Sequence, residues 1–204
     1  FLFIDNGSQD GSIEYLRDQP DVMLYRADID QFRPSRSGRD WVNYLARLHA
    51  LHKWVLCVDA DELLCWPDQE NEGLPGLVKR AERLGPNRVF TPMIDAYSDK
   101  PTSQMAAYVR GQSFGEICPW VDPLEHTKIL WDKGRLILYG GPRNRFVKGE
   151  EKPPITAKQT LYYVEDNGYE HLGAHFDSYG APSPLVAPLL HYRFMPDFSS
   201  RCDK

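Results

Sequence analysis

Two apolar runs, each followed directly by clustered polar side chains, constrain the fold of this chain more than any other feature. Trp54–Val58 is short and apolar and predicts a buried strand, and the tetrad Asp59-Ala60-Asp61-Glu62 follows it. Phe1–Ile4 is a second such run, followed by a polar turn over residues 5–12 that contains two glycines. In an open α/β sheet, ligands bind at the carboxyl ends of the strands. We therefore predict an α/β fold in which both polar turns face one crevice.

The tetrad at the end of the second run indicates a divalent cation. Three carboxylates within four residues repel one another unless a positive charge lies between them. Oxygen ligands of this kind suit Mg²⁺ or Mn²⁺, and these ions in turn bind phosphate oxygens. For a lone D-x-D the alternative is an acidic turn that binds no metal.

Both turns resemble those of a known family. Residues 4–12, IDNGSQDGS, are similar to the DNGSxDGT turn of family 2 glycosyltransferases, which have the GT-A fold, and residues 54–64, WVLCVDADELL, resemble their metal-binding segment. The branch that is most similar is bacterial and has DADE as its tetrad. Residues 140–146, GGPRNRF, and 190–194, LHYRF, also fit that branch. The resemblance is specific over residues 1–67 and thinner over residues 126–198.

The resemblance implies a GT-A fold, that is, a Rossmann-like mixed sheet flanked by helices. It implies a single domain over residues 1–204, with 1–95 as the nucleotide-binding half and 96–204 as the acceptor half. Members of the family have a strand and a helix before the first turn, and this chain begins within a strand and without a methionine. We therefore expect the chain to be truncated at its amino end.

The resemblance further implies an enzyme that transfers a sugar from a nucleotide-diphosphate donor with the help of Mn²⁺ or Mg²⁺. A UDP-sugar is the expected donor, and inversion is the expected stereochemical outcome. The expected acceptor is a glycan or a lipid-linked glycan, as in bacterial polysaccharide biosynthesis. In such enzymes the departing diphosphate needs its charge neutralised, which a bound metal does as a Lewis acid.

Residue roles follow from the family's motifs. The last carboxylate of the D-x-D is the firmest metal ligand there, and the first contacts ribose or metal-bound water. Asp61 is therefore the expected metal ligand, joined by Asp59 directly or through water, with Asp59 also on the donor. The acid of the first turn contacts the nucleobase, which assigns Asp5 and its neighbour Asn6 to donor binding. Asp10, later in that turn, is placed on the donor side as well, or caps the following helix.

Three later residues complete the expected donor and metal site. His191, in the LHYRF segment, is a candidate metal ligand because many GT-A enzymes use a late histidine and imidazole suits Mn²⁺. A packed histidine bonded to the backbone is the alternative. Arg143 and Lys128, with Arg145 beside them, are expected to supply positive charge to the diphosphate or to an acidic acceptor. The alternative for Arg143 is a plain hairpin turn built on Gly140-Gly141.

An inverting transferase also needs a carboxylate that accepts the proton of the attacking hydroxyl. The candidates downstream of the tetrad are Asp95, Glu116, Asp122 and Glu125. We favour Asp122 as the catalytic base because aromatic residues such as Trp120 flank it and often line sugar sites.

Composition is compatible with a globular enzyme and argues against other classes. The chain has 204 residues, 42% of them hydrophobic, and a net charge of −5, so no broad basic surface for nucleic acid is expected. The four cysteines show no C-x-x-C spacing. No apolar run is long enough to span a membrane. A cytoplasmic location, with peripheral contact to the membrane as an option, is the default expectation.

Two alternatives to a glycosyltransferase are weighed. A haloacid-dehalogenase-type phosphatase also uses a strand-terminal D-x-D with Mg²⁺, but it needs a downstream G-D-x-x-x-D, which the sequence lacks. A GT-A domain that binds a nucleotide or a glycan without turnover is the other alternative, and the intact D-x-D argues against it.

The order of elements is expected to be β-α-β-loop-α-β at the front, with short strands and long loops behind. The expected helices cover residues 12–18, 40–52 and 74–84, and a loop is expected over 67–73. The expected strands cover residues 1–5, 22–25, 54–58, 88–94, 127–131, 136–139, 145–148 and 161–164, with a final strand around 191–194.

Overall fold

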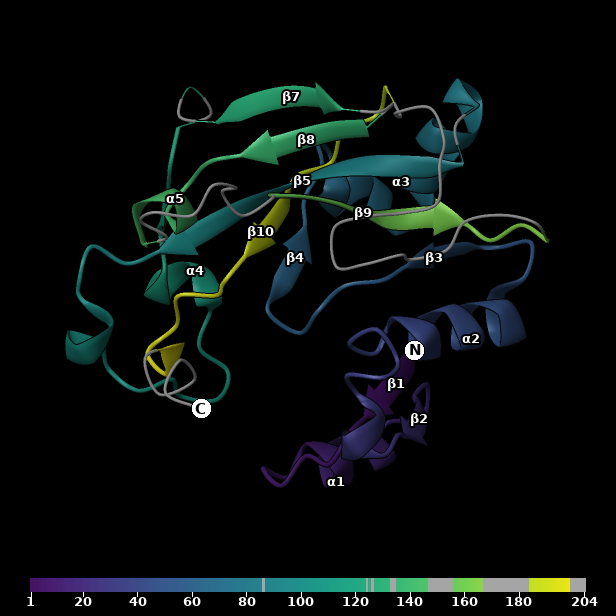
Figure 1. Cartoon of the computed structure of the whole chain (residues 1–204), viewed down its shortest axis with the longest axis horizontal. Helices are drawn as coiled ribbons and strands as arrows, with labels where there is room; N and C mark the ends of the chain where they lie inside the picture. Colours follow the sequence, from purple (N-terminus) through teal and green to yellow (C-terminus); the bar gives the residue numbers. More distant parts are fainter. Residues whose placement is uncertain are drawn as a thin grey trace. The chain divides into compact units, whose positions relative to one another are not determined.

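The computed structural model describes residues 1–85, 87–123, 125, 127–132, 135–146, 156–166 and 184–198, and it has the mixed α/β architecture that the sequence predicts (Figure 1). Strands are β1 (Leu2–Asp5), β2 (Met23–Arg26), β3 (Trp54–Leu56), β4 (Glu62–Leu64), β5 (Arg88–Tyr97), β6 (Trp120–Val121), β7 (Lys128–Asp132), β8 (Arg135–Tyr139), β9 (Ala157–Tyr163) and β10 (Leu189–His191). Helices are α1 (Ser12–Arg17), α2 (Arg39–Ala50), α3 (Gln69–Leu84), α4 (Phe114–Ile117) and α5 (Arg143–Phe146), with 3₁₀ turns at Ile29–Gln31 and Thr102–Gln104.

The described residues form two compact units. Residues 1–55 and 163–166 make up the first unit, and residues from 56 to 162 together with 184–198 make up the second. The first unit contains a βαβ motif, in which β1 and β2 pair in parallel from Leu2 opposite Met23 to Asp5 opposite Arg26. Helix α2 follows and buries Leu45, Ala46 and Ala50, whereas Leu48 and Leu51, which helical spacing also predicts to be core residues, are exposed.

The second unit is built around a curled mixed sheet. Its strand order is β9-β5-β10-β4, with β6 added to β5. Strand β5 is central: it pairs antiparallel with β9 and parallel with β10. Apolar residues fill most of its ten positions, as expected of a strand buried on both faces.

A bulge interrupts the pairing of β5 with β9. The register shifts between Val89 and Thr91, and the backbone N–H of Thr160 then donates to the hydroxyl of Thr91 at 3.3 Å. Both threonines are fully buried. The side chain therefore replaces a ladder hydrogen bond that the bulge removes.

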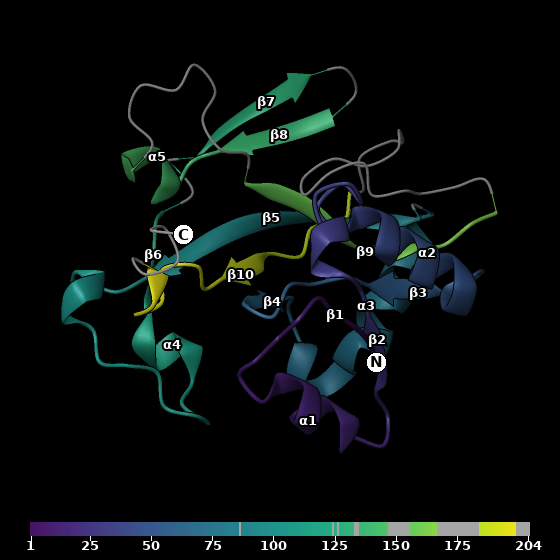
Figure 2. The ribbon, with the colours of Figure 1, turned by 60° about the horizontal axis from the view of Figure 1, so that its bottom comes forward.

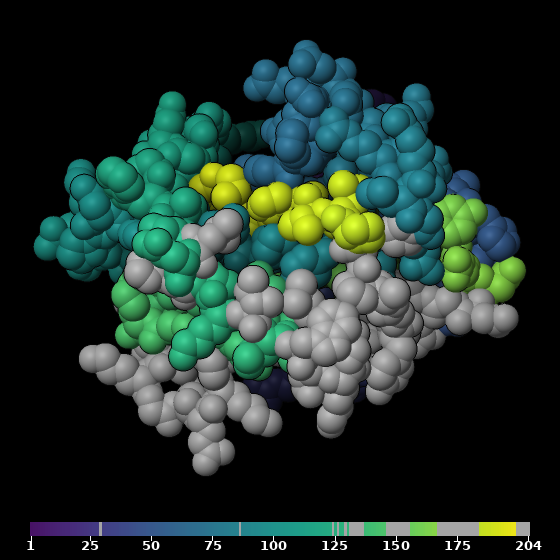
Figure 3. Space-filling model, turned by 90° about the horizontal axis from the view of Figure 1, so that it is seen from above, coloured from purple at the N-terminus to yellow at the C-terminus, as the bar shows by residue number. Residues whose placement is uncertain are grey.

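The two faces of this sheet are covered by different elements. Figure 3 shows α3 (blue) on one side of the segment that contains β10 (yellow) and the chain around the end of β8 and α5 (green) on the other. The hairpin packs through Leu138, which shares a buried cluster with Phe90 of β5 and Ala157 of β9. Figure 2 shows the same hairpin lying over β5. The buried residues of helix α3 are Leu77 and Ala81.

Most predicted elements are confirmed, and several predictions are wrong. The run at residues 54–58 is not the buried strand that the sequence predicts: β3 ends at Leu56, its side chains are only partly buried, and Val58 is 40% exposed. No strand forms at residues 145 and 146, because the turn at Gly141 starts helix α5 there; residues 147 and 148 lie outside the described residues. The predicted loop over 67–73 is helical from Gln69 onward, since Asn71 and Glu72 N–H groups bond to the Asp68 carbonyl. The final strand ends at His191, and residues 192–194 do not continue it.

Within the described part of the chain, no helix combines the length and apolarity that crossing a bilayer requires.

Candidate functional site

The acidic tetrad forms a closed turn at the start of β4. The backbone N–H of Glu62 donates to the carbonyl of Asp59 at 3.1 Å, and the Asp59 N–H donates back to Glu62 Oε2 at 2.9 Å. Glu62, the last residue of the tetrad, therefore fixes the turn with its side chain as well as with its backbone. Its carboxylate is almost fully buried.

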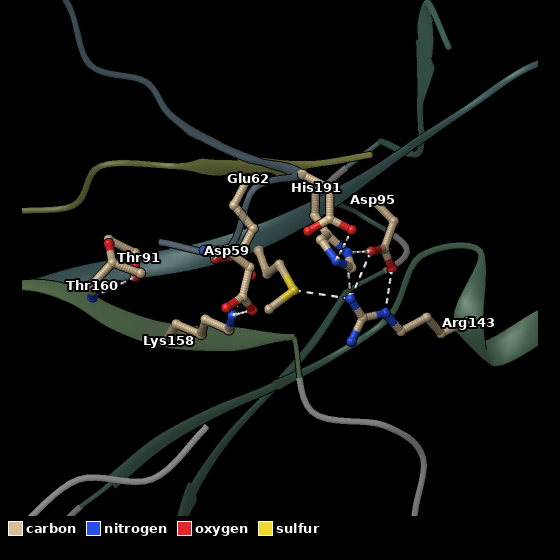
Figure 4. Close-up of polar contacts among 10 residues, drawn as sticks. Asp59, Glu62, Thr91, Asp95, Arg143, Lys158, Thr160 and His191 are labelled. Atoms are coloured by element: carbon tan, nitrogen blue, oxygen red, sulfur yellow. Dashed lines mark hydrogen bonds and ion pairs between the residues drawn. The ribbon is translucent and has the colours of Figure 1, made fainter. Parts of the chain in front are cut away.

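A lysine from β9 balances part of this negative charge (Figure 4). Lys158 Nζ bonds to Glu62 Oε1 and lies 2.9 Å from Asp59 Oδ2. The Lys158 side chain is 10% exposed, whereas that of Asp59 is 56% exposed. Asp59 is therefore a surface carboxylate with an ammonium group on one oxygen, and Glu62 is a buried one held by the same group.

Strand pairing brings His191 to the tetrad. His191 is the last residue of β10, where it stands opposite Glu62 of antiparallel β4 and opposite Asp95 of parallel β5. The next residue, Tyr192, donates its backbone N–H to the Asp61 carbonyl at 2.9 Å. His191 Nε2 consequently lies 3.6 Å from Asp61 Oδ2, so the structure brings together two of the three predicted metal ligands.

The other nitrogen of His191 faces Asp95. Nδ1 lies 2.6 Å from Asp95 Oδ1, and both side chains are buried. Nδ1 also lies 2.7 Å from Arg143 Nη2, a group that can only donate. A lone pair on Nδ1 would be repelled by the carboxylate, which is the closer of the two neighbours, so we assign the ring proton to Nδ1, from which it is donated to Asp95. The Nε2 lone pair then remains on the side of Asp61.

Arg143 contacts both carboxylate oxygens of Asp95. Its Nη2 donates to Asp95 Oδ1 at 2.8 Å, and its Nε lies 2.7 Å from Oδ2. Burial alone would raise the pKa of Asp95, but the hydrogen bonds from His191 and Arg143 and the Arg143 charge hold that pKa below its ordinary 3.8. Asp95 is therefore ionised at neutral pH although its side chain is only 1% exposed.

A glycine with a left-handed backbone conformation supports this arrangement. Gly141 has φ +71°, whereas a Cβ built on it would lie 4.0 Å from Asp95 Oδ2, an ordinary contact, so the backbone conformation is what favours glycine here. The turn at Gly141 starts helix α5, which places Arg143 beside Asp95. The predicted contact of Arg143 with a diphosphate is untested, and its charge is engaged by Asp95.

Asp61 and His191 fit a divalent cation as partial ligands. One carboxylate oxygen and one imidazole nitrogen suit Mn²⁺. Neighbouring ligands of an octahedral ion lie about 3 Å apart, close to the 3.6 Å between Asp61 Oδ2 and His191 Nε2. Such ions commonly take their other ligands from water and substrate phosphates. Among the described residues, no three His, Cys, Asp or Glu side chains converge on one point.

Asp122, the predicted base, lies in a separate polar group at β5 and β6. The Tyr97 hydroxyl donates to its Oδ1 at 2.8 Å, and Arg145 forms an ion pair with its Oδ2. The Asp122 side chain is 8% exposed, while Trp120, two residues earlier, is more than half exposed. Asp122 also lines a small cavity of about 20 Å³ together with Asp95 and Pro142.

The first polar turn belongs to the first unit and is stabilised by its own acids. Asp5 accepts the backbone N–H groups of Gly7 and Ser8, both at 3.0 Å, and bonds with the Ser8 side chain and these N–H groups lower its pKa. Asp10 accepts both the N–H and the hydroxyl of Ser12, the first residue of α1, and these bonds lower its pKa too. Asn6 is half-buried. The convergence of this turn with the tetrad stays a prediction.

Lys128, the remaining predicted donor residue, is exposed at the start of β7, opposite Tyr139 of β8. Sequence reasoning missed Glu62 and Lys158 as partners within the site and Asp95 as the partner of His191. The sequence carries one signal for Lys158, a lysine inside an otherwise uncharged strand, and no local signal for the pairing of residues 95 and 191.

Comparison of the chain with protein-family models, with curated proteins and with solved structures gave no match.

Proposed function

We propose that this protein is a metal-dependent glycosyltransferase that moves a sugar from a nucleotide-diphosphate donor, with UDP as the expected nucleotide, to a glycan or lipid-linked acceptor. The motifs IDNGSQDGS and DADE support the proposal through their resemblance to family 2 glycosyltransferases. The single structural observation that carries it is the approach of His191 Nε2 to Asp61 Oδ2 beside a D-x-D turn.

The orientation of His191 supports the role of a metal ligand over that of a packed histidine. Histidines that bind metals usually donate their second ring N–H to a carboxylate, which fixes the ring and keeps the binding nitrogen unprotonated. Asp95 accepts that N–H here, and Arg143 keeps Asp95 in place. The ring is thereby oriented so that Nε2 can bind a cation next to Asp61.

The chemistry divides among the chain's own residues. A bound Mn²⁺ or Mg²⁺ would neutralise the charge that develops on the departing diphosphate. Asp61 and His191 would hold that ion, and Asp59 would contact the donor at the surface with Lys158 balancing its charge. Asp5, Asn6 and Asp10 keep their roles in donor binding by resemblance alone.

Asp122 remains our candidate for the base, with one requirement added by its surroundings. Arg145 and Tyr97 occupy its two oxygens, so a lone pair is available to an acceptor hydroxyl only after one of these contacts rearranges. Inversion of the sugar's configuration is part of the same proposal.

Isothermal titration of UDP and of GDP into the whole chain, with and without Mn²⁺, tests the proposal. We expect UDP to bind only with Mn²⁺ present, and Asp61→Ala to weaken this binding about tenfold or more. Asp99→Ala, which removes an exposed carboxylate of the same unit, serves as the matched control and should bind UDP like the wild type. Binding that is independent of Mn²⁺, or equal losses in both variants, would refute the proposal. UDP binding without release of sugar from any UDP-sugar would instead favour a non-catalytic nucleotide-binding domain.

A further inference from the structure

A pocket of about 390 Å³ lies beyond the strand ends that carry Asp95 and His191. It begins at Tyr97, two residues after Asp95 on β5, and includes Phe194, three residues after His191. Its volume is typical of sites for small ligands. Its lining residues are Tyr97, Ser98, Lys100, Pro101, Thr102, Met105, Pro142, Arg145, Phe194 and Phe198.

The pocket is connected to the candidate site by shared elements. Pro142 precedes Arg143 and lines both this pocket and the small cavity that Asp95 and Asp122 border. Strands β5 and β10 run in parallel, so the carboxyl ends of both strands lie on the side of the pocket. Ligands of α/β sheets bind at that edge, which places the pocket where a second substrate would be expected.

Aromatic side chains give the pocket flat apolar walls. Tyr97 and Phe198 are partly exposed, and Phe194 is buried and packs edge-on against Phe198 with ring centroids 5.0 Å apart. Aromatic faces of this kind pack well against the C–H face of a sugar ring, while polar groups at the rim orient the hydroxyls. The rim here supplies the hydroxyls of Ser98 and Thr102.

Two cations give the pocket its charge preference. The Arg145 guanidinium lies 5.2 Å from the Tyr97 ring centroid and is paired with Asp122, so it is held in a fixed position. Lys100 is exposed at the pocket and forms no ion pair within the described part of the chain. No aspartate or glutamate of the described chain lines the pocket. Asp122 balances Arg145, which leaves the charge of Lys100 for a ligand.

We propose that this pocket binds a sugar ring that carries a negative charge, a carboxylate or a phosphate, and that this sugar is the acceptor of the transfer. The acceptor role rests on the proposed function, whereas the binding of an anionic sugar does not. Lys100 contacts the anionic group, and the aromatic walls hold the ring.

Methyl NMR on the whole chain, with ¹³C-labelled methionine methyl groups, tests the binding directly because Met105 lines the pocket and Met23 belongs to the other unit. D-glucuronate, D-glucose 6-phosphate and D-glucose are titrated separately, without nucleotide or metal. We expect the anionic sugars to shift the Met105 signal, leave Met23 unchanged, and bind about tenfold more tightly than glucose. The two anionic sugars distinguish a carboxylate from a phosphate as the recognised group.

Charge-reversal variants separate a specific contact from a general effect of charge. Lys100→Glu should weaken binding of the anionic sugars about tenfold and leave glucose binding unchanged. Lys79→Glu makes the same change at an exposed position of α3 that does not line the pocket, and it should bind like the wild type. Equal weakening by both variants, equal binding of glucose and glucuronate, or an unchanged Met105 signal would overturn the proposal.

The outcome is independent of the nucleotide titration. If the chain binds glucuronate but no UDP, the proposed glycosyltransferase function is refuted, whereas the proposal that the pocket binds an anionic sugar is supported. A Met105 shift caused by UDP in place of the sugars would overturn the acceptor role.

Discussion

Asp95 is the residue on which the geometry of the candidate site depends. It receives a hydrogen bond from His191 and an ion pair from Arg143, and its own side chain is buried. A buried carboxylate is tolerated only when it is paired and hydrogen-bonded. Asp95 therefore couples the stability of the second unit to the orientation of His191.

Removing the arginine should expose this dependence. Arg143→Met keeps much of the apolar volume but leaves Asp95 with an uncompensated buried charge, which costs about 3–5 kcal/mol when one partner of a buried pair is lost. We expect the free energy of unfolding of the second unit to fall by that amount. Urea unfolding followed by tryptophan fluorescence measures it.

Arg80→Met provides the matched control on the same unit. Arg80 pairs with Glu72 and Asp68 at the surface, where solvent screens the charges. Arg80→Met should therefore lower the free energy of unfolding much less than Arg143→Met does. If both variants lost a similar free energy of unfolding, the buried Asp95–Arg143 pair would contribute no more to stability than a surface ion pair, which would contradict this prediction.

At the scale of elements, β10 does most to assemble the site. It is three residues long, and its pairing with β4 on one side and β5 on the other aligns residues far apart in the sequence. Its hydrophobic residues are fully or partly buried between these neighbours. A short strand of this kind gives a weak periodic signal, which is why its extent is predicted incorrectly although its histidine is singled out.

Helix α3 contains a kink whose sequence signal is a glycine. Gly73 has φ 58° and ψ −175°, a conformation that is essentially restricted to glycine, and Pro75 follows. The sequence predicts the helix only from residue 74, because Gly73 and Pro75 suggest a helix start there. The structure instead joins a turn at Gln69 to the main helix across the kink.

Gly73→Ala should therefore be destabilising even though the site faces mostly open space. A Cβ would meet the Pro75 ring at 3.5 Å, an ordinary contact, so the cost comes from the backbone conformation and amounts to about 1–3 kcal/mol. Thermal unfolding by circular dichroism measures this loss.

Gly115→Ala in α4 is the comparison for that variant. Gly115 does not have a positive φ, and a Cβ there would lie 3.7 Å from the nearest side-chain atom, so stability should change by no more than about 0.5 kcal/mol. An unchanged transition in Gly73→Ala would mean that the kink relaxes without strain.

At the scale of the whole molecule, the sequence predicts local structure better than the joining of distant segments. The α/β class, both polar turns and the front elements follow from periodicity and turn residues, which act over a few neighbours. The pairing of His191 with Asp95, and of Lys158 with the tetrad, depends on strand order across about a hundred residues. Such order is set by the packing of the complete sheet, which no local pattern encodes.

The central proposal, that Asp61 and His191 hold a divalent cation, is tested most directly by the EPR signal of free Mn²⁺ during titration of the chain with UDP present. We expect the wild-type chain to remove Mn²⁺ from solution, and Asp61→Asn and His191→Gln each to weaken its affinity for Mn²⁺ about tenfold or more. Asp99→Asn should leave the affinity unchanged. Mn²⁺ affinity in Asp61→Asn and His191→Gln equal to that of the wild type would contradict the metal site and the function built on it.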